Sequence, residues 1–390
     1  MHIAPIPHRQ KKMWRSTRQG QQAFQRISRP LPHYTHITHV ETLGGAAIID
    51  RRRFLKQTAL ATAVVSVPYL AGKTLAFGKE NAKGADAALD RALEELVAMD
   101  GGPPGVIAIV VRNLKNNLPL RAKDHMRIAS VAKAFSGAVA LSLVSKGVFS
   151  LNDTIGDLLP GLPKAWHAVT LRQLLNHTSG IRDFTESDEL VAALLDSPKK
   201  APAPRKLLSY AGKMLRFDPG SRYRYSNSDN IVVGLMIEAA TDRSYESQLE
   251  RQVLGPLGLT ETTLPRGPNL SKPFIHGYSN DPSQQSPEDV SEDFAAGWSW
   301  ASGGIVSTPA DLNDFIRGYV GGKLFDRRTR AKQRRIVEGG SSDPPGPGKN
   351  SAGLAIFRYE TRCGTVWGHT GNTFGYTPSL PPRAETGGAR

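Results

Sequence analysis

The order of strand-like and helix-like segments along the chain most constrains its fold. A β-branched run at residues 106–111 predicts a buried strand, and two further strand-like runs, GLAIFRY and TVWGH, occupy residues 353–359 and 365–369. Between them, apolar residues recur with a helical period. Strands at both ends and helices in the middle predict an α/β (α+β) fold, in which an α/β lobe built from both ends carries an inserted, mostly helical lobe.

Helix-like and loop-like stretches can be assigned within this plan. Helices are predicted at residues 85–99, 130–146, 171–181 and 231–242. Gly147 is expected to end the second of them, because glycine terminates helices readily. Residues 265–295 are rich in Pro, Ser, Asn and Asp and predict a long loop region.

The positive charge is concentrated near the N-terminus. The chain has a formal net charge of +15, and residues 1–56 contain eleven Lys and Arg against two acids, leaving +6 for the remainder. A second basic run at 326–335 contains no aromatic residue and predicts a solvated helix face, so no nucleic-acid partner is expected. Cys363 is the sole cysteine, which excludes an internal disulfide and a cysteine-based zinc site.

An export signal is predicted near the start of the chain. Three arginines at 51–53 precede Phe-Leu-Lys, and an apolar stretch at 58–70 follows. That stretch is shorter than the roughly 20 residues of a membrane span. The pattern resembles a twin-arginine signal over residues 48–76, which implies the twin-arginine machinery as a partner and a periplasmic, cell-wall or extracellular location. Residues 1–47 are expected to be a disordered or over-annotated leader.

Three short motifs lie in a fixed order along the chain. They are Ser-Val-Ala-Lys at 130–133, Tyr-Ser-Asn at 225–227 and His-Thr-Gly at 369–371. Together with LLNHTSGI, FDPGSRYRYSN and SGGIVSTPADL, they resemble the penicillin-recognising serine hydrolases over roughly residues 88–376. The branch with class C β-lactamases, D-alanyl-D-alanine carboxypeptidases and related esterases is the most similar. The resemblance implies a β-lactamase/transpeptidase-like fold, with an antiparallel sheet flanked by helices.

The first motif has a chemical rationale of its own. Taken alone, Ser130 and Lys133 could be a helix cap and a surface lysine. A serine hydroxyl needs a base to become a nucleophile, and residues three apart share a helix face. Lys133 could accept the proton of Ser130 only if burial and cationic neighbours lower its pKa.

The resemblance assigns roles to the other motif residues. Tyr225 would carry the proton to the leaving group, and Asn227 would hold both Lys133 and the substrate amide. His369, Thr370 and Gly371 would line an edge strand that pairs with an extended substrate. The backbone N–H groups of Ser130 and Asn372 would form the oxyanion hole.

The first residue of the third motif bears on the substrate. His369 resembles the carboxypeptidase and esterase side of the branch, where class C β-lactamases usually have lysine. We therefore expect D-alanyl-D-alanine carboxypeptidase-like hydrolysis of peptides or related amides and esters, with β-lactams as acylating ligands. Arg358 and Arg362 are candidates for binding a substrate carboxylate. A β-lactamase or esterase with the same residues remains an alternative, as does a non-catalytic penicillin-binding, peptidoglycan-sensing or inactive truncated protein.

Several other residues have competing interpretations. His177 is expected to be a structural loop residue, because the family uses no Ser–His–Asp triad. Trp298 and Trp300 could line the substrate site or pack in the core. Three nearby acids are expected to be solvated loop residues, with no metal and no cofactor required. These acids are Asp183, Glu186 and Asp188.

The domain plan follows from the resemblance. Residues 77–390 are predicted to form the hydrolase domain, with an α/β lobe at about 77–125 plus 300–390 and a helical lobe at about 126–299. After Thr377 the chain reads PSLPPRAETGGAR, where the family continues with two strands and a helix. Codons can be chosen so that another frame encodes an apolar strand, an Asp-Gly turn and a basic strand. We therefore expect a frameshift to have truncated the C-terminal strands and helix.

Overall fold

A computed structural model describes residues 121–278, 288–346, 348–361, 364–376 and 383–384. The predicted export signal, the helix at 85–99, the strand at 106–111, Arg362 and Cys363 lie outside the described residues. Most of the sequence after Tyr376, on which the predicted truncation depends, lies outside them too.

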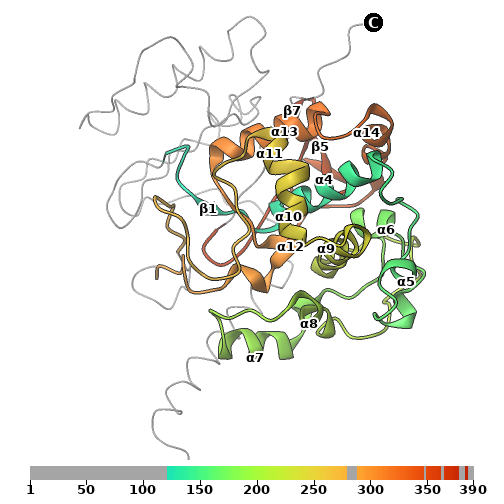
Figure 1. Cartoon of the computed structure of the whole chain (residues 1–390), viewed down its shortest axis with the longest axis horizontal. Coiled ribbons are helices and arrows are strands. Elements are labelled where there is room, and N and C mark those ends of the chain that lie inside the picture. The colour runs from blue at the N-terminus through green and yellow to red at the C-terminus, as the bar shows by residue number, and fades with distance from the viewer. Residues whose placement is uncertain (1–120, 279–287, 347, 362–363, 377–382, 385–390) are drawn as a thin grey trace, which may run out of the picture.

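The central element is helix α4 (Ala132–Ser145), which a 3₁₀ turn, η2 (Ala129–Val131), leads into directly. Every residue from Ala132 to Leu143 is buried, and Figure 1 shows α4 in the middle of the molecule. The helix ends as predicted, with Gly147 at a φ of 71° and the N–H of Val148 bonded back to the Leu143 carbonyl. This pattern is a glycine-terminated C-cap.

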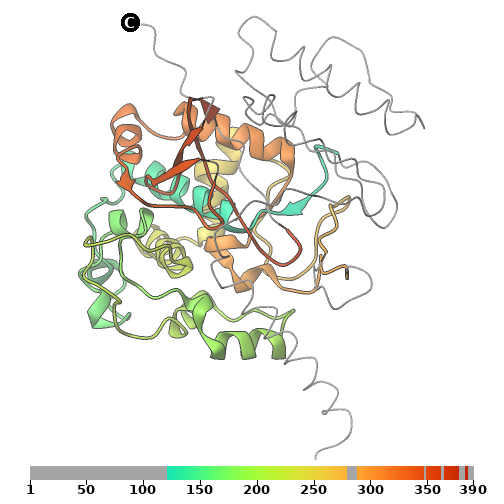
Figure 2. The ribbon, with the colours of Figure 1, turned by 180° about the vertical axis from the view of Figure 1, so that it is seen from behind.

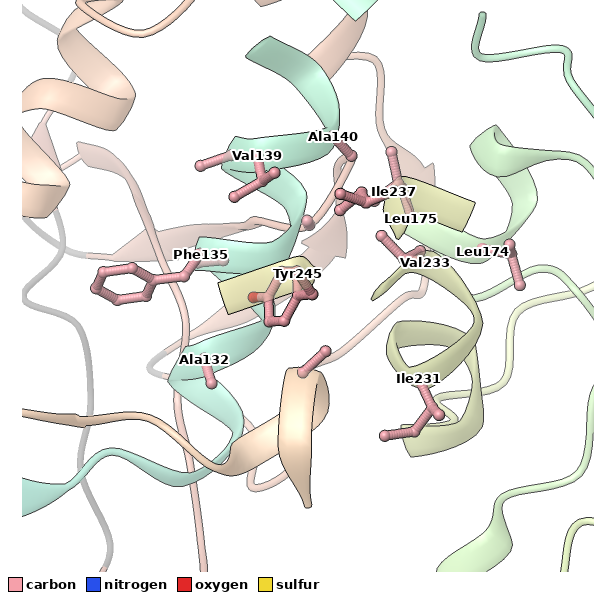
Figure 3. Packing of buried hydrophobic residues seen from close by; sticks show 14 of the residues in the cluster. Ala132, Phe135, Val139, Ala140, Leu174, Leu175, Ile231, Val233, Ile237 and Tyr245 are labelled. Carbon is pink, nitrogen blue, oxygen red and sulfur yellow. The ribbon is translucent and has the colours of Figure 1, made fainter. Parts of the chain in front are cut away.

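Helices pack on several sides of α4. The Phe135 ring stacks on Phe315 of α13 (Pro309–Gly321), with centroids 3.7 Å apart. Helix α9 (Asn227–Thr241) packs on another side, where Figure 3 shows Ala140 facing Ile237 and Phe135 projecting the opposite way. Gly137 lets the connection between β4 and β5 approach α4 closely, as a Cβ added to it would overlap Ala355.

A five-stranded antiparallel sheet lies beside α13 (Figure 2). Its strands, in spatial order, are β3 (Val337–Glu338), β4 (Lys349–Ala352), β5 (Phe357–Thr361), β6 (Gly364–Gly368) and β7 (Arg383–Ala384). A separate antiparallel pair joins β1 (Met126–Arg127) to β2 (Val306–Ser307). The two predicted C-terminal strands are therefore confirmed, although β5 is shorter than the pattern at 353–359 and β6 begins and ends one residue before the pattern at 365–369.

The remaining helices are short and mostly follow residue 150. They are α5 (Ile155–Leu158), α6 (Leu171–Leu175), α7 (Asp188–Asp196), α8 (Pro204–Ser209), α10 (Tyr245–Leu249), α11 (Gly255–Leu257), α12 (Trp300–Gly303) and α14 (Arg327–Gln333). Helical turns join them at η3 (Lys164–Trp166), η4 (Phe184–Glu186), η5 (Glu250–Leu254) and η6 (Ala296–Trp298). Within the described part of 265–295 there is neither helix nor strand, as predicted. No helix among the described residues is long and apolar enough to cross a membrane.

The two faces of the sheet have different neighbours. Phe357 and Tyr359 of β5 pack with Tyr223 and Tyr225 on one face. Arg358 alternates to the other face, since neighbouring residues of a strand point to opposite sides, and it pairs in register with Trp367. The first face is the one that borders the motif residues.

Candidate active site

Ser130 lies in the tight turn that opens the central helix. The residue before it, Ala129, has a φ of 48°, a left-handed conformation that is unusual for a residue with a side chain. Backbone strain of this kind is concentrated at functional sites. The turn places the half-buried Ser130 at the N-terminal end of α4, where the helix dipole favours developing negative charge.

Lys133 is a fully buried lysine with three polar contacts. Its Nζ lies 2.9 Å from the Ser130 Oγ, 2.6 Å from the Asn227 Oδ1 and 2.7 Å from the carbonyl oxygen of Ser302. The side chain is completely inaccessible to solvent. The surface-lysine interpretation of the first motif is thereby excluded, and the predicted shared face of positions 130 and 133 is confirmed.

Burial gives Lys133 the properties of a base near neutral pH. Burial lowers the pKa of its amine to about 7, because the charged form loses its hydration. Three nearby carboxyl groups oppose this effect but do not cancel it: Asp183, Asp343 and Asp229. An amine with a pKa near 7 is partly neutral at physiological pH and can accept a proton.

Tyr225 presents its phenol next to these two residues. The Lys133 Nζ lies 5.1 Å from the centre of the Tyr225 ring. Burial raises the pKa of the phenol well above its usual value, and the nearby Ser130 hydroxyl acts in the opposite direction. Among the described groups, the Tyr225 hydroxyl makes no hydrogen bond of acceptable geometry. A buried polar atom without a partner is unusual in a folded protein, and the predicted role of Tyr225 in proton transfer remains a prediction.

The third motif begins one residue after β6 ends. His369 is fully buried, with its Nδ1 2.6 Å from the Thr370 carbonyl oxygen and its ring edge-on to Phe357. Burial, assisted by the charge of Lys133, lowers the pKa of His369 to about 3. The histidine is therefore neutral near pH 7. The Thr370 hydroxyl donates to the carbonyl of Pro344.

Gly371 brings the third motif against the first. A Cβ added to Gly371 would lie 3.0 Å from the backbone nitrogen of Ser130 and 2.9 Å from the Ile128 carbonyl oxygen. Only glycine permits this approach, because contacts that short do not occur for real side chains. Asn372 follows at an exposed position. The role of its N–H in an oxyanion hole remains a prediction.

Three predicted features differ from the structure. Asp183 was expected to be solvated, but it is 8 % exposed and accepts two hydrogen bonds from Asn227. The third motif was expected within an edge strand, but β6 ends at Gly368 and also pairs with β7. Arg358 was a candidate for binding a carboxylate, but it lies on the other sheet face and pairs with two acids. These acids are Glu338 and Glu360.

Other expectations agree with the structure. Glu186 and Asp188 are exposed, as predicted, but neither lies in a loop: Glu186 ends the helical turn η4 and pairs with Arg216 and Arg224, and Asp188 begins helix α7. Trp298 and Trp300 are buried in the core, which favours the packing alternative.

A buried polar cluster behind Tyr225 had not been predicted as a unit. His177 lies with its ring 4.5 Å from that of Tyr225, and its Nδ1 is 3.0 Å from the Asp229 Oδ2. The Ser179 hydroxyl donates to the other oxygen of Asp229 at 2.6 Å. Burial lowers the pKa of His177 and raises that of Asp229. The sequence signal was the NHTSG stretch, which indicated a structural loop but not its partner on α9.

Comparisons with known proteins agree with this arrangement. The chain matches the family model described as Beta-lactamase over residues 89–388. It is 30% identical to Protein flp of Staphylococcus aureus (strain MRSA252) over 195 residues, which is 49% of this chain and 37% of that protein. It is 29% identical to Penicillin-binding protein 4* of Bacillus subtilis over 182 residues, covering 45% and 39%. The chain thus matches less than half the length of these relatives.

Solved structures give the same fold. A D-stereospecific amidohydrolase from Streptomyces sp. aligns with a TM-score of 0.61 and 28% identity, covering 75% of this chain and 88% of that one. The D-amino acid amidase from Ochrobactrum anthropi SV3, solved with L-phenylalanine amide, aligns with a TM-score of 0.60 and 24% identity, covering 69% and 75%. The predicted β-lactamase/transpeptidase-like fold is therefore confirmed, and the chain belongs to the Beta-lactamase family of serine β-lactamase/transpeptidase-fold proteins.

Proposed function

We propose that the protein is a serine hydrolase that works through an acyl-enzyme on Ser130. The observation that carries this proposal is the contact of 2.9 Å between the Ser130 hydroxyl and the buried amine of Lys133. A solvent-exposed lysine could not act in this way, because its pKa would keep it protonated at neutral pH. Here the base and the nucleophile are already within hydrogen-bonding distance.

In the first half of the reaction, Lys133 takes the proton of Ser130 while Oγ attacks the substrate carbonyl carbon. The resulting oxyanion is held by backbone N–H groups, for which Ser130 and Asn372 are the proposed donors. The Tyr225 hydroxyl then gives its proton to the leaving amine or alkoxide and takes the proton of Ser130 back from Lys133, so that both side chains are again neutral. Collapse of the tetrahedral intermediate breaks the scissile bond and leaves an ester on Ser130.

In the second half, water attacks this ester. The neutral base removes a proton from the water, and the serine leaves with its hydroxyl restored. The same groups act in reverse roles, as microscopic reversibility requires. The net reaction is hydrolysis of an amide or ester bond.

Amides and esters of D-amino acids are the first proposed substrates, and D-alanyl-D-alanine-type peptides, which end in a free carboxylate, are the second. The family membership and the fold shared with D-stereospecific amidases support this class. A specific observation favours amides and esters over substrates with a free carboxylate. His369 is buried and uncharged near pH 7, and Arg358 points away from the motif face, so neither supplies a cation for a carboxylate.

Parallel turnover assays on four substrates test the proposal. We expect hydrolysis of a D-amino acid amide or a p-nitrophenyl ester to exceed that of a D-alanyl-D-alanine peptide or a chromogenic β-lactam, and Ser130→Ala to abolish all of it. Fast β-lactam turnover would favour the β-lactamase alternative. Covalent penicillin labelling without turnover of any substrate would favour a non-catalytic receptor.

We also propose that the protein is exported by the twin-arginine route and acts outside the cytoplasm. The arginines at 51–53 and the apolar stretch after them support this location. Replacing Arg51 and Arg52 by lysine should retain a reporter fusion in the cytoplasm. Unchanged export of that variant would contradict the proposal.

A further inference from the structure

We infer that Asp183 is a positioning residue that fixes the side-chain amide of Asn227 with its oxygen, and not its nitrogen, toward Lys133. Because this role presupposes the hydrolase chemistry proposed above, it adds a residue outside the three motifs to that chemistry. Asp183 precedes the short helical turn η4 and is separated from Asn227 by 44 positions in the chain.

The contacts of Asp183 require a carboxylate. Its Oδ2 accepts hydrogen bonds from the Asn227 backbone N–H at 2.9 Å and from the Asn227 Nδ2 at 2.8 Å. Its Oδ1 accepts from the Thr185 N–H at 3.0 Å and from the Thr185 hydroxyl at 2.9 Å. Each oxygen therefore faces at least one N–H donor. A side chain with an oxygen on one branch and an NH₂ group on the other cannot satisfy both sides.

This pair of bonds determines which way the Asn227 amide points. With Nδ2 donating to Asp183, Oδ1 is directed to the Lys133 Nζ at 2.6 Å. Rotating the amide by half a turn would place its oxygen against the Asp183 carboxylate and its NH₂ group against the amine. Both contacts would then be repulsive or unpaired in a buried setting, which is costly.

The orientation of Asn227 in turn determines what Lys133 can do. A neutral amine has two hydrogens and one lone pair. The Asn227 Oδ1 and the Ser302 carbonyl oxygen are both acceptors, so they take the two hydrogens. The lone pair is left for the third contact, the Ser130 hydroxyl. If Asn227 presented its NH₂ group, that group would compete for the lone pair, and Lys133 would lose its function as base.

The charge of Asp183 has a second effect, on the pKa of Lys133. The negative charge of Asp183 raises the pKa of Lys133, against the larger lowering by burial. Other groups act on this amine from separate parts of the chain. They are Asp229 on α9, Asp343 between β3 and β4, Tyr225 before α9, His177 after α6 and His369 after β6. Removing the Asp183 charge alone should therefore lower the Lys133 pKa.

The test compares Asp183→Asn with the exchange variant Asp183→Asn/Asn227→Asp, using a p-nitrophenyl ester. The single variant should lose on the order of 10²-fold in kcat/KM, the scale of one misplaced acid–base group. In the exchange variant, the amide introduced at position 183 can donate to the carboxylate introduced at position 227, whose other oxygen faces Lys133. We expect the kcat/KM of the exchange variant to be at least about tenfold higher than that of the single variant. The acidic limb of its kcat/KM profile should lie at higher pH, because the new carboxylate is next to the Lys133 amine.

Asp326→Asn is the matched control. Asp326 caps the N-terminus of α14 through the Thr329 N–H, the same kind of capping bond that Asp183 makes at η4. Its variant should keep wild-type kcat/KM, and thermal melting of all variants would show whether they fold. NMR titration of the Lys133 amine gives a readout independent of turnover, and its pKa should fall in Asp183→Asn.

The outcomes separate this inference from the proposed function. If wild type turns over the ester, Ser130→Ala does not, and Asp183→Asn stays within about threefold of wild type, Asp183 has no positioning role while the hydrolase proposal stands. If wild type shows no Ser130-dependent turnover, the proposed function fails. In that case an unchanged Lys133 pKa in Asp183→Asn would overturn the inference as well. A lowered Lys133 pKa would support the link from Asp183 through Asn227 to Lys133.

Discussion

Gly371 lies so close to Ser130 that a Cβ atom added to it would come within 3.0 Å of the Ser130 backbone nitrogen. This contact joins the third motif to the first across about 240 residues of sequence. It also brings the exposed Asn372, the next residue along the chain, close to the proposed nucleophile. The close approach makes the glycine itself a testable part of the site.

Gly371→Ala should reduce turnover more than it reduces stability. The added methyl group must displace the Ser130 amide or the Ile128 carbonyl, and losing one oxyanion donor costs on the order of 10²–10³ in kcat. Overpacking costs about 1–3 kcal/mol. Steady-state kinetics and urea unfolding measure the two effects. Gly267→Ala is the control, since an added Cβ there has no neighbour within 4 Å. Wild-type turnover in Gly371→Ala would refute the proposed arrangement.

The rate should depend on pH through the Lys133 amine. Catalysis needs the neutral amine, so kcat/KM should rise with pH up to about 7, the pKa of Lys133, and then level off. Lys133→Arg, which stays protonated, should lose on the order of 10²–10⁴ in kcat. A profile of kcat/KM from about pH 5 to pH 9 checks this expectation. A flat profile in wild type would count against Lys133 as the base.

The same shift predicts a pH dependence of stability. Between about 7 and the ordinary value of 10.5, the unfolded chain binds a proton on Lys133 that the folded protein has lost. The free energy of unfolding contributed by this group should therefore rise with pH across that window. Unfolding curves for wild type and Lys133→Met at several pH values measure it, because the variant lacks the titrating group. Identical slopes for the two proteins would contradict the shift.

Tyr225→Phe should separate activity from stability. The buried hydroxyl has no acceptable hydrogen-bond partner among the described groups, so its removal should leave the melting temperature unchanged or slightly raised. Turnover should fall by on the order of 10²–10⁴, the contribution of a proton-transfer group. Tyr245→Phe is the matched control, since its hydroxyl is also buried without a partner among those groups. Equal turnover of the two variants would exclude the proton-transfer role.

His369 should make the protein sensitive to acid. Its pKa is about 3 in the folded protein against an ordinary 6.5, so the unfolded chain binds its proton first. Stability from this group is present above about pH 6.5 and is lost as pH falls toward 3, at up to about 1.4 kcal/mol per pH unit. Urea unfolding of wild type and His369→Asn between those values should show a shallower pH slope in the variant. Parallel slopes would mean that His369 titrates normally.

Local sequence patterns were sufficient to predict the central helix and the geometry of the first motif. The apolar period after Ser130 predicted α4, Gly147 predicted its end, and the spacing of three residues predicted that Lys133 would lie beneath Ser130. Each of these features depends on neighbours within a few residues. The order of the three motifs then indicated the fold through a family resemblance.

Long-range burial could not be predicted in the same way. Asp183 looks like a loop acid, and its burial depends on Asn227, 44 positions away. The neutral state of His369 likewise depends on tertiary packing, because burial beside Phe357 removes the ring from solvent. The strand before it ends at Gly368, one residue before the predicted end, and the chain turns back further on, where Thr373 pairs with Tyr376.

Trapping the acyl-enzyme tests the central claim most directly. Wild-type protein would be mixed with a slowly hydrolysed p-nitrophenyl ester, quenched in acid within the first turnover, digested and mapped by mass spectrometry. We predict one acyl group, carried by Ser130 and absent from Ser130→Ala. An acyl group on another residue, or ester turnover that persists in Ser130→Ala, would contradict it.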